Sequence, residues 1–278
     1  MKKCLISSNC QGVPLASQLL SFPDFVAEYE LEVFLNYTKA IIPDNKLAMC
    51  DLLIYQRLDN SWGNLSEDYL LNHVNPHAKI ICMPNMVNFS LWPTACNSGG
   101  GSNDLWGDKF IDTLIARNLD VKEIVYLVMK ADLAKLYTVD NVALESLQRE
   151  RNKKYDFCSE LCDFVEENFK KQQLFSTPNH PYGILLNYIA KKVLESIGYS
   201  NISMYFVPNL DCDTEFHLPI HPSIVKYFNL SFVKEEHLYP VFGRNINYRE
   251  YLYDYVLAKQ QKIPVGIFLK EYGQIAEK

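Results

Sequence analysis

Short apolar runs alternate with helical patterns along the first part of the chain. Four runs have the length and composition of strands, and two of them are nearly all apolar, as in strands buried on both faces of a parallel sheet: KKCLIS, YELEVFLNY, DLLIYQ and AKIICMP. After the first run, VPLASQLLSF places apolar residues at helical spacing, and Pro14 suits a first helical turn. Strands that alternate with helices predict an α/β fold in which helices cover a parallel sheet.

From about residue 140 the pattern becomes mainly helical. The segment LFSTPNHPYGILLNYIAKKVLESIGY carries one apolar stripe with its lysines away from it, and ISMYFVP is expected to be a last strand. No repeat or low-complexity linker marks a boundary. We therefore expect a single α/β domain over residues 1–278, with a parallel-sheet core in 1–130 and a mainly helical part in 131–278 packed on it.

Charge and hydropathy exclude several classes of protein. A net charge of −6 argues against nucleic-acid binding, because neutralising phosphates requires clustered lysine and arginine. No apolar run approaches the roughly 20 residues that span a bilayer, so no membrane span is expected. The apolar stretch after the first lysines is too short for the core of a signal peptide, which predicts a cytoplasmic protein.

The chain has eight cysteines, and none of them forms a C-x-x-C pair. Zinc sites usually draw on such pairs, so no metal is expected, and a cytoplasmic protein is not expected to hold disulfides. Most of the cysteines lie in apolar runs and are interpreted as small buried hydrophobic residues. Cys158 and Cys162, four residues apart on the apolar side of an expected helix, are examples.

Cys10 has a different setting, between the first strand and the first helix. In parallel sheets ligands bind beyond the carboxyl ends of the strands, and a helix N-terminus favours a thiolate. Asn9 and Gln11 flank the thiol with amide donors of the kind an oxyanion needs, and Gly12 lets the backbone approach a ligand. Cys10 is therefore a candidate nucleophile. The alternative is a buried thiol beside an ordinary helix cap.

A thiol nucleophile needs a base, usually histidine. Of the six histidines, His180 and His221 each precede a proline and an amphipathic run, in TPNHPYGILL and LPIHPSIVKY. Proline at a first helical turn would place each histidine near a helix N-terminus, where it stays neutral and can act as a base. Ordinary capping is the alternative for both. We favour His180, because Asn179 could orient its ring.

An irregular stretch, NMVNFSLWPTACNSGGGSNDLWGD, is long for a loop in a compact domain, which is typical of a functional segment. Its residues Gly101–Asp104, GSND, resemble the glycine-x-asparagine-aspartate block of serine esterases with a flavodoxin-like sheet. They are either an oxyanion-hole element or turn residues. Phosphate-binding and dinucleotide-binding fingerprints are absent from the sequence.

Taken together, SNCQG, DLLIYQ, KIICMPN, TPNHPYGILLNYIAKKVL and LPIHPSIVKYFNL follow the order found in the WcbI-type capsule polysaccharide biosynthesis proteins. The resemblance covers about residues 3–235. It implies a flavodoxin-like or SGNH-hydrolase-like three-layer sheet. The glycine that usually precedes Asn-Cys-Gln in this family is Ser8 here.

The resemblance also implies a reaction, the transfer of an acetyl group from acetyl-coenzyme A to a sugar hydroxyl. It carries over to Cys10, with Asn9, Gln11, Gln56, His180 and His221 around it. The anionic end of coenzyme A (CoA) would need cations, and LQRERNKK offers four, unless that run is a solvated helix face: Arg149, Arg151, Lys153 and Lys154. Two other classes remain open, a glycan esterase or deacetylase with the same site and a non-catalytic protein that binds CoA or a glycan.

Overall fold

Four parallel strands form the main sheet of the protein, in the order β2-β1-β3-β4. The computed structural model describes residues 1–97, 105–200, 202 and 215–271. The strands are the four apolar runs of the sequence analysis: β1 (Lys2–Ser8), β2 (Tyr29–Leu35), β3 (Leu52–Tyr55) and β4 (Lys79–Cys82). The predicted parallel sheet is therefore confirmed, and all its strands lie within residues 2–82.

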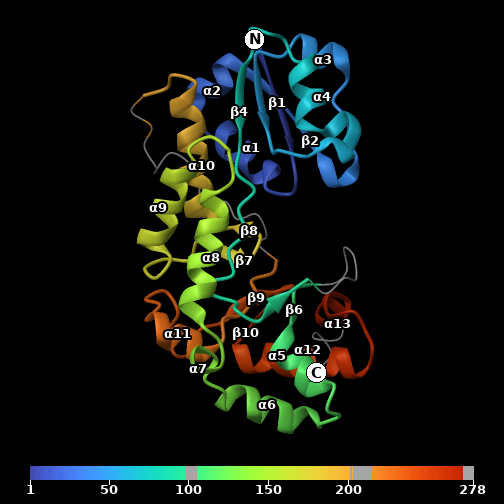
Figure 1. Ribbon diagram of the computed structural model, residues 1–278, viewed down its shortest axis with the longest axis vertical. Helices are drawn as coiled ribbons and strands as arrows, with labels where there is room; N and C mark the ends of the chain where they lie inside the picture. The colour runs from blue at the N-terminus through green and yellow to red at the C-terminus, as the bar shows by residue number, and fades with distance from the viewer. Residues whose placement is uncertain (98–104, 201, 203–214, 272–278) are drawn as a thin grey trace.

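Alternation along the strands divides the side chains between two faces. Cys4 and Ile6 lie in the larger core with Leu15 of α1, whereas Leu5 lies in a smaller core with Leu47 of α3. Figure 1 shows the resulting layers, with α1, α2 and α10 (Gly183–Ser196) on one side of the sheet and α3 and α4 on the other. This is the expected three-layer α/β arrangement. Its helices and turns in the first part of the chain are α1 (Gly12–Leu20), α2 (Pro23–Glu28), η1 (Asn36–Thr38), α3 (Asp44–Ala48), η2 (Asn60–Leu65) and α4 (Glu67–His73).

The rest of the described chain is mainly helical, as expected, with three short strand pairs. The helices are α5 (Lys109–Ile115), α6 (Val121–Lys130), α7 (Leu133–Leu136), α8 (Val139–Arg151), α9 (Cys158–Asn168), α10 (Gly183–Ser196), α11 (Pro222–Phe228), α12 (Tyr248–Gln260) and α13 (Val265–Glu271). The strand pairs are β5 (Ala95–Cys96) with β6 (Gly107–Asp108), β7 (Phe175–Thr177) with β8 (His180–Pro181), and β9 (Tyr239–Val241) with β10 (Arg244–Ile246).

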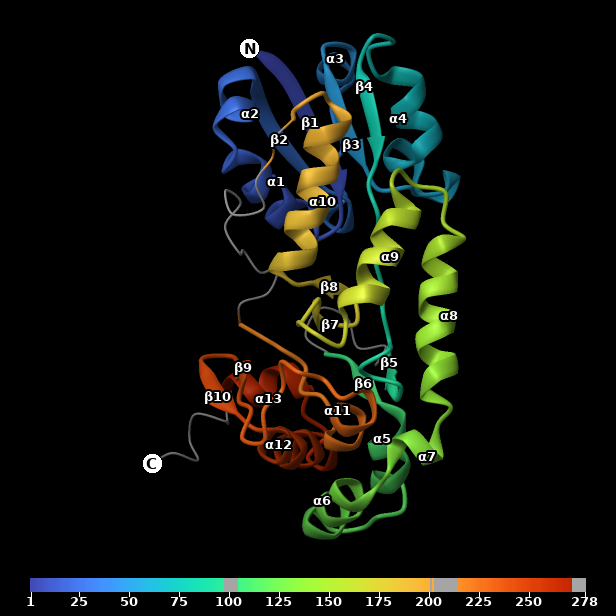
Figure 2. The same ribbon diagram turned by 90° about the vertical axis from the view of Figure 1, so that its left-hand side faces the viewer.

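The elements are not grouped in space as the expected division at residue 130 implies. The helices α5 and α6 precede that residue, yet they pack against α12 at the end of the molecule far from the sheet (Figures 1 and 2). Conversely, α10 follows it and packs on α1 over the sheet. Apolar periodicity identifies a helix but not the surface that it covers, which explains the difference. The expectation of one domain stays a prediction.

Between the two ends of the molecule lie α8, α9 and the β7–β8 pair (Figure 2). The chain that leaves β4 runs past them toward β5, and its hydrogen bonds are described below. Among the helices that the structure describes, none combines the length and the apolar character needed to cross a membrane.

Candidate active site

Cys10 lies in a tight turn between the end of β1 and the start of α1. The Oδ1 atom of Asn9 accepts a hydrogen bond from the Gln11 backbone N–H at 2.9 Å, and the Asn9 carbonyl accepts one from the Gly12 N–H at 3.1 Å. Cys10 is partly exposed, whereas Gln11 and Gly12 are buried. The expected position of the thiol, after the first strand and before the first helix, is confirmed.

The structure shows a packing reason for glycine at position 12, and the ligand approach that we expected there stays a prediction. A Cβ atom at this position would lie 1.7 Å from Oγ of Ser8, 3.0 Å from Cβ of Ser8 and 3.3 Å from a methyl group of Ile6. Ser8 is fully buried, and its hydroxyl donates to the Asn9 carbonyl at 3.1 Å. Gly12 is therefore needed because the Ser8 side chain fills the adjacent space.

Gln56 follows β3 and supports the turn from the neighbouring strand. Its Oε1 accepts from the Asn9 backbone N–H at 2.8 Å, and its amide nitrogen donates to Oε1 of Gln11 at 3.4 Å and to the Pro84 carbonyl at 3.1 Å. In the strand order β2-β1-β3-β4, the chain adds β2 on one side of β1 and adds β3 and β4 on the other. The boundary between β1 and β3 is therefore a switch point, where ligands bind in open α/β sheets. The turn is therefore placed where a ligand is expected.

Gln11 joins the turn to two more distant segments. Its amide nitrogen donates to the Asn179 carbonyl at 2.8 Å and to the Met86 carbonyl at 3.3 Å. Both hydrogens of the Gln11 amide, and both of the Gln56 amide, are thus used inside the protein. Gln11 was expected to donate to an oxyanion and Gln56 to belong to the site. In this geometry both side chains support the turn, and any role toward a ligand stays a prediction.

The sulfur of Cys10 lies 3.4 Å from Nε2 of His180. Nδ1 of His180 lies 2.7 Å from the Thr177 hydroxyl, which donates to Oδ1 of Asn179 at 3.0 Å; that oxygen also accepts from Trp106 Nε1 at 3.0 Å. The one hydroxyl hydrogen of Thr177 goes to Asn179, so its oxygen accepts from Nδ1–H of His180. This tautomer turns the lone pair of Nε2 toward the sulfur.

A short hairpin brings His180 to the thiol. β7 and β8 pair antiparallel, with Thr177 opposite His180 and with Pro178 and Asn179 in the turn between them. The helix that follows begins only at Gly183, so the expectation that His180 stands at a helix N-terminus is wrong. Pro181 belongs to the strand pair, where its missing N–H is tolerated at an edge.

His221 has the capping geometry that was the alternative for both histidines. It precedes Pro222 at the start of α11, and its Nδ1 accepts from the Ser223 N–H at 3.1 Å. Its Nε2 lies 2.9 Å from the Val128 carbonyl and must donate to it. Both ring nitrogens are therefore held by the backbone. Burial lowers the pKa of His221, against the opposing effects of that carbonyl and of Asp132.

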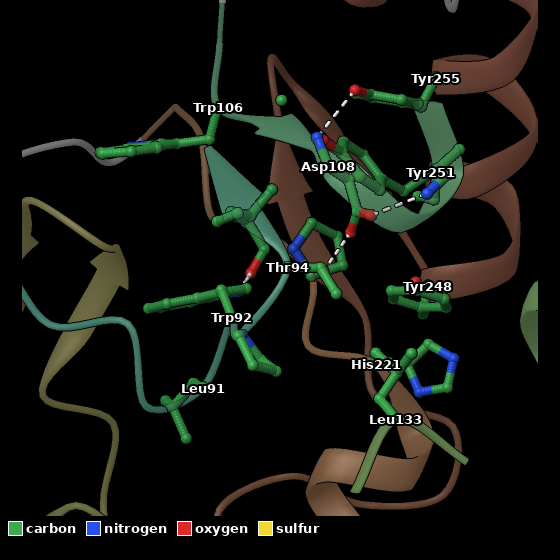
Figure 3. Close-up of a pocket in the computed structure, with 16 residues that line it drawn as sticks. Leu91, Trp92, Thr94, Trp106, Asp108, Leu133, His221, Tyr248, Tyr251 and Tyr255 are labelled. Carbon is green, nitrogen blue, oxygen red and sulfur yellow. Dashed lines mark hydrogen bonds between the residues drawn. The ribbon is translucent and has the colours of Figure 1, made fainter. Parts of the chain in front are cut away.

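The surroundings of His221 leave little room for a substrate. Figure 3 shows the ring beside Tyr248 and Leu133, at the edge of a cavity of about 30 Å³ that also receives Asp108. That volume suits a water molecule or two. Neither Cys10 nor His180 lines this cavity. The geometry accordingly favours His180 over His221 as the partner of the thiol.

The expected cationic run on α8 divides into residues with different partners. Arg151 pairs with Asp163 and Glu166 of α9, at 2.7 and 2.8 Å, so its charge holds two helices together. Arg149 donates to the Val87 carbonyl. Helical spacing places Arg151 on the side of α8 opposite Arg149, so these two side chains do not face one ligand, and Lys153 lies just beyond the end of the helix.

Lys153 does face an open cavity, one of about 460 Å³. We call this the cationic pocket; its lining comprises Arg57, Cys82, Met83, Asn85, Asn152, Lys153, Lys154 and Tyr155. Arg57 pairs with Glu67 at 2.8 Å, Lys153 pairs with Glu150 at 2.8 Å, and Lys154 is exposed. Asn85 connects the pocket to the turn, because its Oδ1 accepts from the Asn9 amide at 3.2 Å.

Two amide groups near the thiol have hydrogens to spare. The Asn9 amide nitrogen donates one to Asn85, and its second has no partner within the described part of the chain. Oδ1 of Asn179 is fixed by Trp106, so its nitrogen points elsewhere and makes no hydrogen bond among the described residues. Asn9 and Asn179 are therefore better placed than Gln11 or Gln56 to hold an oxyanion.

Some expectations fall outside the described residues. These are the GSND element at 101–104, most of the expected strand ISMYFVP, and Cys212. The seven cysteines that the structure describes form no disulfide with one another. Cys162 is fully buried as expected, while Cys158 is partly exposed and donates to the Glu150 carbonyl. Over the described ranges no group of three potential metal ligands occurs.

Sequence reasoning missed three residues that shape the site: Thr177, Asn85 and Arg57. Asn85 and Arg57 come soon after β4 and β3, so the rule that ligands lie at the carboxyl ends of strands could have found them. Thr177 stands three residues before His180, but only the hairpin turns its hydroxyl onto the ring.

A thiol and an imidazole lie together at the switch point of a parallel sheet, the position where open α/β proteins bind their ligands. The chain belongs to the WcbI family of polysaccharide biosynthesis enzymes, whose family model matches residues 3–201. No curated protein matches the chain.

The fold is also similar to a solved structure, described as native WcbI, a novel polysaccharide biosynthesis enzyme, without a disulfide bond between CoA and one of its cysteines. The TM-score is 0.77 at 19% identity, over 100% of this chain and 95% of the other. The family resemblance and the fold class expected from the sequence are both confirmed.

Proposed function

We propose that this protein transfers the acetyl group of acetyl-CoA to a hydroxyl group of a sugar in a capsular or surface polysaccharide. The observation that carries the proposal is the 3.4 Å contact between Cys10 Sγ and His180 Nε2, beyond the carboxyl end of strand β1. Membership of a polysaccharide biosynthesis family supports the sugar as acceptor. The description of the related structure, which mentions CoA beside a cysteine, supports CoA as the acetyl carrier.

The first half of the reaction forms an acetyl-enzyme. Nε2 of His180 takes the proton of the Cys10 thiol, and the thiolate attacks the carbonyl carbon of acetyl-CoA. The tetrahedral intermediate collapses by breaking its bond to the CoA sulfur, which leaves with the proton from His180. Thr177 holds Nδ1–H throughout, so the proton enters and leaves at Nε2. One thioester is exchanged for another, a step with little net driving force.

The second half transfers the acetyl group to the sugar. His180 takes the proton of a sugar hydroxyl, whose oxygen attacks the carbonyl carbon of acetyl-Cys10. The Cys10 sulfur leaves and recovers a proton from His180, which restores the starting state. The product is an oxygen ester, which is more stable than the thioester consumed, so the reaction runs forward.

Both tetrahedral intermediates place negative charge on the carbonyl oxygen. The second hydrogen of the Asn9 amide and the amide group of Asn179 are the donors we assign to that oxygen. Gln11 and Gln56 hold the Asn-Cys-Gln turn, so they act on the rate through the position of the sulfur. Gln11 donates to the Asn179 backbone carbonyl, so Asn179 is connected to the turn that carries Cys10.

The cationic pocket is the place we assign to the anionic end of CoA. Arg57, Lys153 and Lys154 supply positive charge around a cavity of about 460 Å³. Two of these charges are shared with Glu67 and Glu150, and Lys154 brings a charge without an ion-pair partner among the described residues. A strand end separates this pocket from Cys10, so the pantetheine arm would run past Asn85 to reach the thiol.

The test is chromatographic measurement of free CoA and of O-acetylated sugar, starting from acetyl-CoA and a panel of neutral and acidic monosaccharides. The wild type should release CoA in step with the appearance of an acetylated sugar. Cys10→Ala should release no CoA above the uncatalysed rate. Undiminished transfer by Cys10→Ala would rule out the nucleophile, and CoA release without acetylated sugar would indicate that water is the acceptor.

A further inference from the structure

One face of α8 holds the segment of residues 84–89 that follows β4. Three α8 residues and one residue just after the helix hydrogen-bond to the backbone of this segment: Ser146, Arg149 and Glu150 of α8, and Lys153. Ser146 accepts from the Phe89 N–H at 3.2 Å, and Arg149 donates to the Val87 carbonyl. Glu150 accepts from the Val87 N–H at 3.3 Å, and Lys153 donates to the Asn85 carbonyl at 2.6 Å. Figure 2 shows the chain after β4 running beside α8.

The same segment contacts the Asn-Cys-Gln turn through its other groups. The carbonyl groups of Pro84 and Met86 accept hydrogen bonds from the side-chain amides of Gln56 and Gln11, and Oδ1 of Asn85 accepts from the Asn9 amide. Residues 84–89 therefore form a layer between α8 and the turn that carries Cys10. These hydrogen bonds connect α8 to the turn through residues 84–89.

Glu150 is the centre of the α8 contacts. Its side chain is 1% exposed, and its carboxylate binds Lys153 Nζ at 2.8 and 2.9 Å and the Tyr155 hydroxyl at 3.1 Å. Arg149 Nε lies 3.6 Å from it. A buried carboxylate is costly unless it is paired and hydrogen-bonded. Here it orients both cations that bind the carbonyl groups of residues 84–89, and it receives the Val87 N–H itself.

We propose that Glu150 is a positioning residue for the Cys10 site. It fixes residues 84–89 through its own carboxylate and through Lys153 and Arg149, and this segment in turn fixes Asn9, Gln11 and Gln56 around the thiol. It touches neither substrate nor sulfur. The proposal deepens the proposed function, but it depends only on Cys10 being a reactive thiol held by this turn.

The experiment compares Glu150→Gln with the matched control Arg151→Gln. Both change one charged residue of α8 that forms ion pairs, but Arg151 binds α9 and not residues 84–89. The readouts are the pH profile of Cys10 alkylation by iodoacetamide, followed by peptide mapping, and the melting temperature. Neither needs acetyl-CoA or a sugar, so the outcome is separate from that of the transfer assay.

Glu150→Gln should change the alkylation rate of Cys10 at neutral pH by about three- to tenfold, because small displacements have large effects on reactivity. Arg151→Gln should leave the profile at that of the wild type, whatever its melting temperature. Equal profiles in Glu150→Gln and the wild type, or equal changes in both variants, would overturn the proposal. If Glu150→Gln does not fold, the Cys10 alkylation profile of Lys153→Met is compared with that of the wild type instead. This variant removes the hydrogen bond to the Asn85 carbonyl, and an unchanged profile would overturn the proposal.

Discussion

Replacing Gly12 by alanine should destabilise the protein, but it should cost little further stability in a chain whose Ser8 is already glycine. A Cβ at position 12 would lie 1.7 Å from the Ser8 hydroxyl oxygen and 3.0 Å from its Cβ. Ser8 is fully buried, so its hydroxyl can rotate away only by giving up its hydrogen bond to the Asn9 carbonyl. Without the Ser8 side chain, the nearest atom is a methyl carbon of Ile6 at 3.3 Å, a tight but tolerable contact.

The size of each effect follows from these contacts. Overpacking a tight site costs about 1–3 kcal/mol, and Gly12→Ala should fall in that range. Ser8→Gly loses one hydrogen bond, worth about 1 kcal/mol, and gains the flexibility of glycine, which costs about 0.5–1 kcal/mol more. The double variant should resemble Ser8→Gly alone, which gives a coupling energy of about 1–3 kcal/mol between the two positions.

Urea unfolding of the wild type, both single variants and the double variant measures this coupling. Peptide mapping of Cys10 alkylation in the same four proteins shows whether the turn is displaced with it. An unchanged unfolding midpoint in Gly12→Ala would show that the clash is relieved at no cost. A double variant whose loss of stability equals or exceeds the sum of the two single losses would refute the assignment of Ser8 as the clashing group.

Three further predictions concern the thiol and the two histidines. Iodoacetamide should label Cys10 faster than Cys50 near neutral pH, because burial raises the pKa of Cys50 to about 11; equal rates by peptide mapping would contradict an accessible, reactive Cys10. His180→Ala should lower the transfer rate about 10²–10⁴-fold in steady-state kinetics. His221→Ala should instead lose about 1 kcal/mol of stability in urea unfolding, as expected for a lost helix cap. A large rate loss in His221→Ala with little rate loss in His180→Ala would reverse the assignment. Because burial lowers the pKa of His221, its stabilising contribution is complete above the ordinary value of about 6.5 and falls as the pH drops below it. His221→Asn keeps a capping side chain and should lose less stability than the wild type between pH 7 and pH 5, and parallel urea curves across that range would contradict the assignment.

The sheet and the position of Cys10 were predictable because they depend on local pattern. Short apolar runs such as LLIY at 52–55 have few alternatives to a buried strand, and Cys10 follows the first of them directly. The packing of α5 and α6 against α12 was not predictable in this way. Many surfaces would bury their apolar stripes equally well, and only the complete set of helices selects one.

The two His-Pro elements show why one local pattern can have two outcomes. In both, a histidine precedes a proline and an apolar run, yet His221 caps a helix and His180 lies in a hairpin. The hairpin depends on pairing with Phe175–Thr177 and on the fit of Asn179 between Gln11 and Trp106. These are contacts between residues distant in sequence, which periodicity does not encode.

The cations on α8 could have been sorted further from the sequence alone. Arg149 and Arg151 are two residues apart on one expected helix, so Arg151 is turned away from Arg149 by about 200°. What the sequence could not show is that a buried Glu150 and residues 84–89 take up the face that carries Arg149. The acidic partner of a cation therefore helps to decide whether that cation is available to a ligand.

The most direct test of the account is mass spectrometry of the protein after a brief incubation with acetyl-CoA and an acid quench. With His180 and Cys10 paired as the structure places them, the peptide that contains Cys10 should carry one acetyl group on sulfur. The label should disappear when an accepting sugar is added and should be absent from Cys10→Ala. Acetylation of the sugar by a wild-type protein whose Cys10 never becomes acetylated would contradict the central claim, because the thiol would then be a bystander to direct transfer.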